Sequence, residues 1–371
     1  MKIGTVKEIK RHEYRVGLTP DCVRVYINQG HEILIEAGAG VDAGFLDDDY
    51  KAVGGIIVNE RQDVFDDSEM IVKVKEPQPE EYELLHQEQI LYTYLHLAAD
   101  KRQTEALMER GVKALAYETI ETADGLLPCL KPMSEIAGRL SVQEAAKYLE
   151  KPFGGRGVLL GGVPGIERGK VTIIGAGIVG MNACKIAVGM GANVHVLDIN
   201  AKRLEYLDDI FGSRITTLYS TEANIDKAVQ ESDALIGAVL LPGAKAPNLI
   251  KRMHLSRMKK GAVLVDVAVD QGGCFETTHA TTHDDPIYII DDVVHYAVAN
   301  MPGAVALSST LALTSATLAY GLELAGKGFE QAIQDSPALR KGVNVYKGNV
   351  VYEQVASALD IPCASLDDLL T

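Results

Sequence analysis

Two cationic residues near the start of the chain stand where they could bind an anionic molecule. Arg15 lies in the basic and polar segment 7–20 and is followed by Val-Gly-Leu, where the chain turns inward. A guanidinium there could hold a carboxylate with two parallel hydrogen bonds, although a solvated surface arginine fits the same pattern. Lys75 lies near the end of the run MIVKVKEP, in which strand alternation puts Lys73 on the same face. Ligands of α/β proteins bind at such strand ends, but a surface lysine is the more ordinary interpretation.

Two other residues could transfer protons. His96 stands near the end of ILYTYLHLAAD, a segment that reads as a largely buried strand. It is either a core histidine with a satisfied hydrogen bond or an acid/base group. Asp270 ends the apolar stretch GAVLVDVAVD just before Gly272 and Gly273. It could face a ligand at the carboxyl end of a strand, or simply cap the turn. Neither segment alone separates these alternatives.

A glycine pattern gives the most specific chemical signal. In VTIIGAGIVG, Gly175, Gly177 and Gly180 have the G-x-G-x-x-G spacing between a predicted strand and a predicted helix. The first glycine permits a tight turn, the second admits a pyrophosphate, and the third lets the helix pack on the strand. Asp198 ends the next predicted strand, about 20 residues later, where a carboxylate accepts hydrogen bonds from the adenosine ribose. The motif predicts NAD rather than NADP, with Arg203 nearby leaving some tolerance of NADP.

One histidine pair superficially suggests a metal site. His279 and His283 are four residues apart, with Glu276 and Asp284 near them. The HExxH order is absent, and the threonine-rich segment before Pro286 is typical of a loop rather than a helix. We therefore predict no metal there.

The composition excludes several classes of partner. The 371 residues carry a formal net charge of −15, which argues against nucleic acid and anionic membranes as partners. The cysteines form no CxxC pair, which favours a reducing compartment, and the first ten residues lack an apolar signal core. These features predict a cytoplasmic protein. The segment between Asp292 and Glu323 has no fixed charge, and we interpret it as strand, loop and core helix rather than a membrane span.

The elements that must position these residues alternate between strands and helices. Strands are predicted around residues 2–8, 31–38, 70–77, 91–98 and 112–120, with a helix at about 21–28 among them. A loop rich in proline and glycine follows at 127–140, then a helix from Ser141, and after Lys170 the alternation is more regular. A long helix is predicted at about 309–324. This pattern is typical of an α/β protein with mainly parallel sheets.

We predict two Rossmann-like, doubly wound domains joined by long helices, with a cleft between them. The first, which would hold the substrate, is discontinuous: residues 1–133 form its first segment and residues 307–371 return to it as helices. Residues 134–306 form the dinucleotide-binding domain.

Several motifs in order resemble those of one family. The segments GTVKEIKRHEYRVGLTP, IVKVKEPQ, YTYLHLA, KPMSEIAGR, GGVPG, VTIIGAGIVG, VDVAVDQGG and ANMPGAV resemble bacterial L-alanine dehydrogenases over essentially the whole chain. The NAD-binding subunits of proton-translocating transhydrogenases share some of these motifs. The resemblance implies NAD-dependent, reversible oxidative deamination of L-alanine to pyruvate and ammonia, by a homo-oligomer that is commonly a hexamer.

The resemblance also implies roles for individual residues. Arg15 would bind the substrate carboxylate, Lys75 its carbonyl or hydroxyl oxygen, and His96 and Asp270 would be the acid/base groups. The cofactor would be contacted by Ser134, Gly175, Gly177, Ile178, Val179, Gly180, Asp198, Arg203, Ser220, Val239, Leu240, Val267, Ala268, Val269, Asp270, Val298, Ala299, Asn300 and Met301. Met133, Tyr94 and Met301 would close a small pocket around the alanine methyl group. Some members hold magnesium through a glutamate and a histidine one helical turn apart, but here Glu323 is followed by Lys327, so we predict no metal.

Two other functions stay open on the sequence. One is a related enzyme that condenses a keto acid with an amino acid reductively. The other is a transhydrogenase-type subunit that binds NAD and catalyses nothing alone. The second alternative is disfavoured because the chain has the complete set of candidate substrate and acid/base residues and no predicted membrane segment. These residues are Arg15, Lys75, His96 and Asp270.

Overall fold

The structure of the chain is a computed structural model that describes residues 1–239 and 248–371. It consists of two compact units, each with its own sheet. Unit 1 comprises Met1–Met133 and Gly303–Thr371, and unit 2 comprises Ser134–Pro302. The fold class is confirmed: two mainly parallel α/β sheets, one of them in a unit made of two separate segments.

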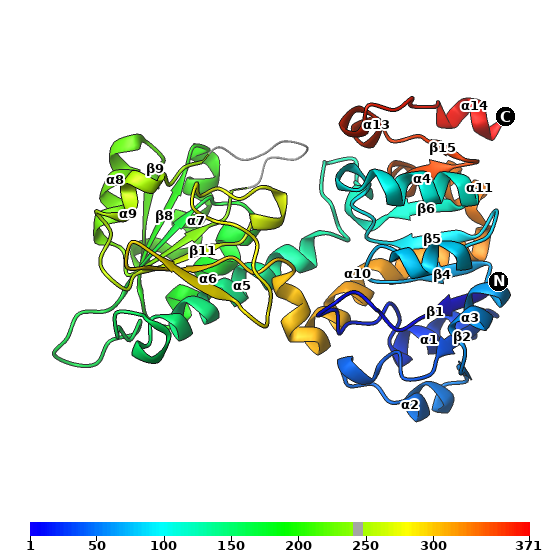
Figure 1. Cartoon of the computed structure of the whole chain (residues 1–371), viewed down its shortest axis with the longest axis horizontal. Helices are drawn as coiled ribbons and strands as arrows, with labels where there is room; N and C mark the ends of the chain where they lie inside the picture. Colours follow the sequence, from blue (N-terminus) through cyan, green and yellow to red (C-terminus); the bar gives the residue numbers. More distant parts are fainter. Residues whose placement is uncertain (240–247) are drawn as a thin grey trace. The chain divides into compact units, whose positions relative to one another are not determined.

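The sheet of unit 1 has the strand order of a doubly wound fold. Its order is β15-β14-β6-β5-β4-β1-β2-β3, and the six strands from β6 to β3 are parallel (Figure 1). In sequence order these are β1 (Lys2–Thr5), β2 (Glu32–Glu36), β3 (Ile56–Val58), β4 (Met70–Val72), β5 (Ile90–Thr93) and β6 (Lys113–Ala116). The return segment adds β14 (Val343–Tyr346) and β15 (Asn349–Val350), which pair antiparallel. The strand order reverses between β1 and β4, which is where ligands bind in such sheets.

Helices of unit 1 bury apolar faces against this sheet. Thr19 caps α1 and accepts a hydrogen bond from the Cys22 N–H, while Pro20 occupies the first turn, where its missing N–H costs nothing. The helices are α1 (Pro20–Asn28), α2 (Asp47–Ala52), α3 (Arg61–Asp67), α4 (Lys101–Arg110), α10 (Ala306–Lys327), α11 (Phe329–Asp335), α12 (Pro337–Gly342), α13 (Glu353–Leu359) and α14 (Leu366–Leu370). One apolar cluster joins α3, α4 and α13 to the strands through residues such as Phe65, Leu107 and Val355.

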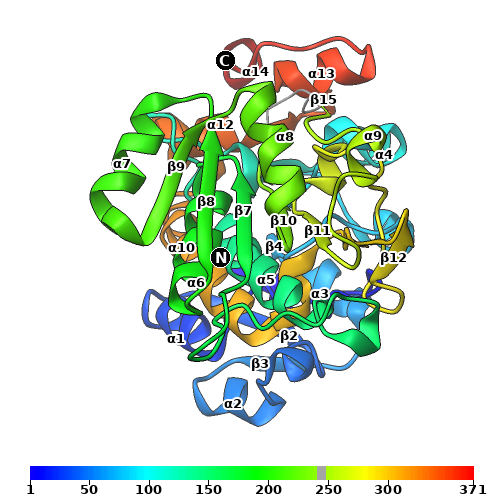
Figure 2. The ribbon, with the colours of Figure 1, turned by 90° about the vertical axis from the view of Figure 1, so that its left-hand side faces the viewer.

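The sheet of unit 2 repeats the same parallel order. It runs β12-β13-β11-β10-β7-β8-β9, with β12 alone antiparallel, and Figure 2 shows β7, β8, β9 and β10 side by side. Its strands are β7 (Lys170–Ile174), β8 (Asn193–Asp198), β9 (Ile215–Tyr219), β10 (Ala234–Gly237), β11 (Val263–Asp266), β12 (Ile287–Ile290) and β13 (Val293–Tyr296). Its helices are α6 (Ile178–Gly189), α7 (Ala201–Phe211), α8 (Glu222–Glu231) and α9 (Arg252–Leu255), together with most of α5 (Lys131–Tyr148). The switch point lies between β7 and β10.

The predicted loop at residues 127–140 is wrong from Lys131 onward. Helix α5 already begins at Lys131, ten residues before the predicted helix start. Pro132 is compatible with helix here because it falls in the first turn. Gly138 is required for packing rather than for a turn, because a Cβ there would lie 2.2 Å from the Val179 carbonyl oxygen of α6. Composition indicated a loop, whereas the close contact of two helices explains the glycine.

Helix α10 is the main element of the uncharged segment. Among the described residues, Met301–Lys327 is one helical stretch long and apolar enough, by length and composition, to cross a membrane, and a third of that window is buried inside the protein (33%). Within unit 1, the Tyr92 hydroxyl donates to the Thr317 carbonyl at 3.0 Å. Gly321 lies so close to the Tyr26 hydroxyl that a Cβ would be 2.0 Å from it. The buried face of α10 therefore packs directly on α1 and β5.

Candidate active site

The candidate substrate residues of unit 1 all follow carboxyl ends of parallel strands. Arg15 lies on the segment after β1, Lys75 three residues after β4, and His96 three residues after β5. These three strands are neighbours in the sheet, in the order β5-β4-β1. The arrangement brings a guanidinium, an ammonium and an imidazole to one edge of the sheet, beside its switch point.

Arg15 is a buried cation held by a buried carboxylate. Its Nε and one terminal nitrogen each donate to an oxygen of Glu13 at 2.6 Å, and both residues are almost fully enclosed. The other terminal nitrogen contacts the Met133 sulfur at 2.9 Å. A bidentate pair of this kind fixes the plane of the guanidinium. Sequence reasoning missed Glu13, although its position two residues before Arg15 was a usable signal.

Lys75 lies near the cations Arg15 and Lys10 and near the carboxylates Glu76 and Glu13. Burial lowers the pKa of Lys75 below its ordinary value, and the nearby Arg15 charge lowers it further. Glu76 opposes this effect, but its carboxylate pairs with Lys10, and its Oε2 atom is buried without a hydrogen-bond partner. No hydrogen bond or ion pair to the Lys75 ammonium is found within residues 1–239 and 248–371. An ammonium in this position can donate to an oxygen of a bound anion.

His96 is held by its backbone rather than enclosed by its strand. It has left-handed backbone geometry, with φ of 51°, and its N–H donates to Glu118 at 2.6 Å. Its side chain is 43% exposed, and its Nδ1 lies 3.9 Å from the same carboxylate. The strand predicted around residues 91–98 ends earlier than expected, at Thr93. Leu95 and Leu97 are still buried, but the His96 side chain between them is not. An accessible imidazole can exchange protons with a ligand.

Tyr94 connects the cationic residues with the histidine. Its ring stacks on that of His96, with centroids 5.9 Å apart and planes 9° apart. Its hydroxyl donates to the Cys129 carbonyl at 2.6 Å. Burial raises the pKa of Tyr94, and the nearby positive charge of Arg15 opposes this effect. Glu118, which was missed from the sequence, lies 22 residues beyond His96 on the next strand connection, so no local signal could have found it.

The glycine motif of unit 2 has the geometry that a dinucleotide requires. Gly175 has φ of 107° in the turn after β7. A Cβ on Gly180 would lie 1.8 Å from the Gly175 carbonyl oxygen, so α6 can approach β7 only with glycine there. Among residues 1–239 and 248–371, the nearest atom to a Cβ on Gly177 would belong to Arg203, at 4.0 Å. Gly177 directly precedes α6, and the N–H groups at a helix N-terminus favour an anionic group.

The acidic residue of the motif is oriented by backbone groups. Asp198 ends β8 and is 7% exposed; its carboxylate accepts from the Ala176 N–H at 2.6 Å and the Asn200 N–H at 2.7 Å. Arg203 is more than half exposed and lies 3.9 Å from the same carboxylate. Ser220 follows β9, and its N–H donates to the Asp198 carbonyl. These residues form one edge next to the glycine turn.

The remaining candidate cofactor residues mostly follow other carboxyl strand ends of unit 2. Ile178 and Val179 begin α6. Val239 follows β10, the residues from Val267 to Asp270 follow β11, and those from Val298 to Met301 follow β13. Ser134 lies on α5, one turn before the contact of Gly138 with α6. Leu240 lies outside the described residues.

Two aspartates near the end of β11 have different environments. Asp266 is buried, and its carboxylate accepts from the N–H groups of Cys274 and Phe275 and from the Thr278 hydroxyl. Burial raises the pKa of Asp266, and these hydrogen bonds oppose that effect. Asp270 is exposed in the short helical turn Val269–Gln271. Asp266 therefore organises the loop, and Asp270 presents an exposed carboxylate.

The residues considered for metal binding have other partners. Glu323 pairs with Lys327 at 2.8 Å, and Lys327 also pairs with Asp335 at 2.8 Å. The ring of His279 stacks on that of Tyr288, with centroids 4.0 Å apart. Across the described part of the chain, no group of three or more metal-ligating side chains is found.

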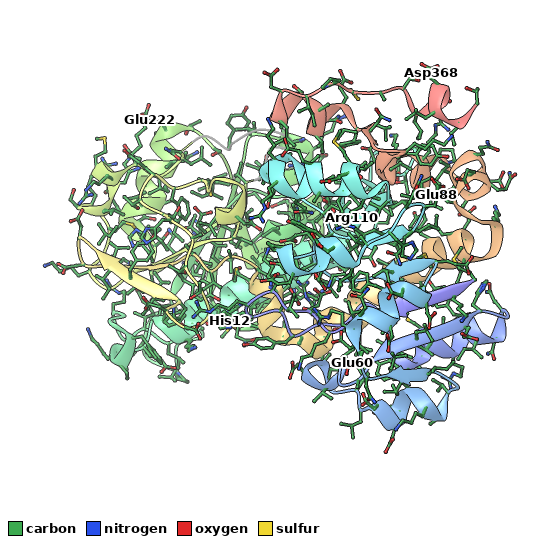
Figure 3. All side chains as sticks on the ribbon, turned by 45° about the vertical axis from the view of Figure 1, so that its right-hand side comes forward. His12, Glu60, Glu88, Arg110, Glu222 and Asp368 are labelled. Atoms are coloured by element: carbon green, nitrogen blue, oxygen red, sulfur yellow. The ribbon has the colours of Figure 1, made fainter. Side chains whose placement is uncertain are left out.

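A polar surface pocket of about 600 Å³ lies elsewhere on unit 1. It is formed by residues that precede β5 and β6 and by the turn between β14 and β15, and Figure 3 labels two of them, Glu88 and Arg110. These segments mark the amino ends of the parallel strands. The pocket contains none of the candidate site residues, and charges of both signs line it.

Comparison with known proteins assigns the chain to a family. The model described as "Alanine dehydrogenase/PNT, N-terminal domain" matches residues 4–137, and the corresponding C-terminal model matches residues 141–353. A protein of Methanococcus maripaludis named alanine dehydrogenase is 54% identical over 363 residues, which cover 98% of this chain and 97% of that protein. One of Staphylococcus haemolyticus with the same name is 53% identical over 371 residues, covering 100% and 99%.

Two solved structures are also similar to this chain. An L-alanine dehydrogenase matches with a TM-score of 0.95 and 52% identity, covering 97% of this chain and 99% of that one. A transhydrogenase from Sinorhizobium meliloti matches with a TM-score of 0.82 and 21% identity, covering 95% and 99%, and so shares the fold. The family and the two Rossmann-like units imply a nucleotide cofactor. The chain belongs to the alanine dehydrogenase/PNT family.

Proposed function

We propose that this protein is an NAD-dependent alanine dehydrogenase that converts L-alanine reversibly to pyruvate and ammonia. The observation that carries the proposal is the identity of more than half over the full chain with proteins named alanine dehydrogenase. The geometry supports it, because each unit presents a chemically suitable set of side chains at the carboxyl edge of its sheet. A bound nicotinamide would supply the hydride acceptor or donor.

Unit 1 supplies the substrate-binding groups of this proposal. The Arg15 guanidinium, fixed by Glu13, binds the carboxylate of alanine or pyruvate. The Lys75 ammonium donates to the carbonyl or hydroxyl oxygen of the substrate, which increases the electrophilic character of the carbon. Met133 touches Arg15 directly, so its side chain borders the bound carboxylate and helps to limit the size of the substrate side chain.

His96 or Asp270 performs the proton transfers. In the direction of deamination, removal of hydride from the alanine Cα leaves an iminium ion. A water molecule adds to that carbon as the general base takes its proton. The same group then gives that proton to the amine nitrogen and takes up the proton of the carbinolamine hydroxyl, as the C–N bond breaks and pyruvate and ammonia form. Both side chains are accessible, which this exchange requires.

Unit 2 supplies the cofactor-binding residues. The open space at Gly177 accepts the pyrophosphate, and the residues after β9, β10, β11 and β13 line the rest of the cofactor. Asp198 supports the choice of NAD, because a carboxylate near the adenosine ribose repels a 2′-phosphate. With Arg203 nearby, we expect a lower activity with NADP, measured as the ratio of kcat/KM for the two cofactors.

We also propose a cytoplasmic homohexamer. All five cysteines are free, which fits a reducing compartment. The hexamer rests on the family resemblance and is tested by the mass of the purified protein in solution.

The decisive experiment follows NADH oxidation by the purified protein. We expect activity with pyruvate plus ammonia, and a large loss in His96→Ala. Activity only with pyruvate plus an amino acid would instead identify a reductive condensing enzyme. Binding of NADH without turnover of any of these substrates would favour a non-catalytic NAD-binding subunit.

A further inference from the structure

A buried chain of charges lies beside the backbone of Lys75 in unit 1. The Lys73 ammonium is fully buried between the Glu8 Oε2 atom at 3.1 Å and the Glu81 Oε1 atom at 3.0 Å. Glu81 is in turn 3.3 Å from Arg61, which also pairs with Glu36. Five ionised side chains are thus joined within one unit, and no substrate role accounts for them.

One carboxylate links this network to the candidate substrate site. Glu8 uses Oε2 for Lys73, while its Oε1 accepts from the N–H of Val74 at 2.7 Å and from the N–H of Lys75 at 3.3 Å. The side chain of Glu8 is almost completely buried, so water cannot replace these contacts. The direction in which the Lys75 side chain leaves the backbone therefore depends on the position of Glu8.

The charge of Lys73 keeps Glu8 suited to this task. Burial raises the pKa of Glu8, and Lys73 is the largest influence that lowers it. Without the ammonium, the carboxyl group would take up a proton more readily and accept hydrogen bonds more weakly. The network also anchors the loop after β1, because Arg61 donates to the Lys7 carbonyl and Glu36 accepts from the Lys7 N–H.

We propose that Lys73 is a positioning residue of the substrate site, which acts through Glu8 to hold the backbone of Lys75 in place. This inference rests on the proposed function, in which Lys75 binds the substrate oxygen. It predicts that loss of Lys73 impairs substrate use and leaves binding of NADH, which depends on unit 2, unchanged.

The test compares Lys73→Met with Lys113→Met. Lys113 is a suitable control because its ammonium also pairs with two carboxylates, Glu88 at 2.8 Å and Glu330 at 2.7 Å, but at the amino end of β6. We expect Lys73→Met to lower kcat/KM for alanine and pyruvate by about tenfold or more, with the KM for NADH unchanged. Lys113→Met should leave these kinetic constants near those of the wild type, whatever its effect on thermal stability.

A second measurement does not depend on activity. The rate at which a low concentration of acetic anhydride modifies Lys75, read by peptide mass spectrometry, should rise in Lys73→Met and not in Lys113→Met. If the wild type has no activity with alanine, the proposed function fails, and this rate still tests the positioning by Lys73. An unchanged rate at Lys75 would overturn the inference, as would equal kinetic losses in the two variants.

Further variants cover the case in which Lys73→Met does not fold. Lys73→Met/Glu81→Gln removes one of the carboxylates that would otherwise be left unpaired. Glu8→Gln keeps an oxygen that can accept from Val74 and Lys75, whereas Glu8→Ala does not. A smaller loss of kcat/KM in Glu8→Gln than in Glu8→Ala supports positioning through Glu8, and equal losses contradict it.

Discussion

At the scale of single residues, the candidate site depends on partners that restrict its charged groups. Arg15 and Glu13 form a buried bidentate pair. Removing one partner of such a pair leaves an uncompensated buried charge, at a cost of about 3–5 kcal/mol. The two hydrogen bonds of the pair also fix the orientation of the Arg15 guanidinium. A substitution that keeps the positive charge but changes the shape of the side chain should therefore impair substrate binding.

Arg15→Lys tests this geometry. Lysine keeps the positive charge but cannot form two parallel hydrogen bonds with Glu13 and still present a planar edge to a carboxylate. We expect kcat/KM for alanine to fall by about 10- to 100-fold, or roughly 1.4–2.8 kcal/mol in transition-state binding. Steady-state kinetics measures the effect, with the KM for NADH as the internal control. Kinetics equal to the wild type would remove Arg15 from substrate binding.

Replacing Lys75 by methionine should have opposite effects on stability and activity. Its pKa is lower in the folded protein than in the unfolded chain, so its charged form destabilises the fold at neutral pH. Lys75→Met should therefore unfold at a higher temperature than the wild type at pH 7. This difference in unfolding temperature should shrink as the pH rises towards the ordinary lysine pKa, because Lys75 then becomes neutral in both the folded protein and the unfolded chain. Calorimetry over this pH range checks the effect on stability, and steady-state kinetics checks the expected loss of activity.

If the stability difference between Lys75→Met and the wild type stays constant with pH, the surroundings of Lys75 do not lower its pKa. The natural control is Lys113→Met, because the pKa of Lys113 is raised by Glu330 and Glu88. That variant should be less stable than the wild type at pH 7.

At the scale of elements, the two sheets explain why the candidate residues gather. Both sheets have the parallel order 3-2-1-4-5-6, so the carboxyl ends of their strands meet along one edge. Short strands of three to six residues lead into loops that carry the chemistry. Neighbouring loops then fix one another, as Glu118 after β6 does for His96 after β5.

The glycine turn allows two substitutions with different outcomes. Gly180→Ala places a Cβ 1.8 Å from a backbone oxygen, so α6 must move away from β7 and unit 2 should be strongly destabilised. Gly177→Ala meets no atom of the described residues closer than 4.0 Å, so thermal unfolding should stay close to that of the wild type. Its NADH affinity should nevertheless fall by about tenfold or more, because the methyl group occupies space meant for the pyrophosphate.

Thermal unfolding and titration with NADH, followed by its fluorescence, separate these two outcomes. Normal NADH affinity in Gly177→Ala would contradict the placement of the pyrophosphate. Normal stability of Gly180→Ala would contradict the close contact of α6 with the turn.

At the scale of the whole molecule, the proposed function assigns different ligands to the two units. Amide hydrogen exchange should show this division. NADH should protect the segments after β7 and β8, around residues 175–180 and 198–203. Oxalate, a stable analogue of a small keto acid, should protect segments of unit 1 around residues 8–15, 73–76 and 94–97. Protection of one set by both ligands, or of neither set, would contradict the assignment.

The sequence alone determined the fold class and most of the candidate site. Glycine spacing, strand–helix alternation and family motifs are local signals, so they identified Gly175, Gly177 and Gly180, the acid Asp198, and the candidate Arg15. They were less reliable for α5, where Pro132 and Gly138 resemble loop residues although each has a helical explanation.

Only the tertiary structure revealed how the candidate residues are held. Glu118 reaches His96 across neighbouring strands, and Glu8 reaches Lys73 and Lys75 across 65 and 67 positions of sequence. It also showed that His96 is partly exposed, with left-handed backbone geometry, rather than part of the strand predicted around residues 91–98. The physical reason is that type and spacing follow from local conformation, whereas burial, ion pairing and pKa depend on which distant segments the sheet brings together.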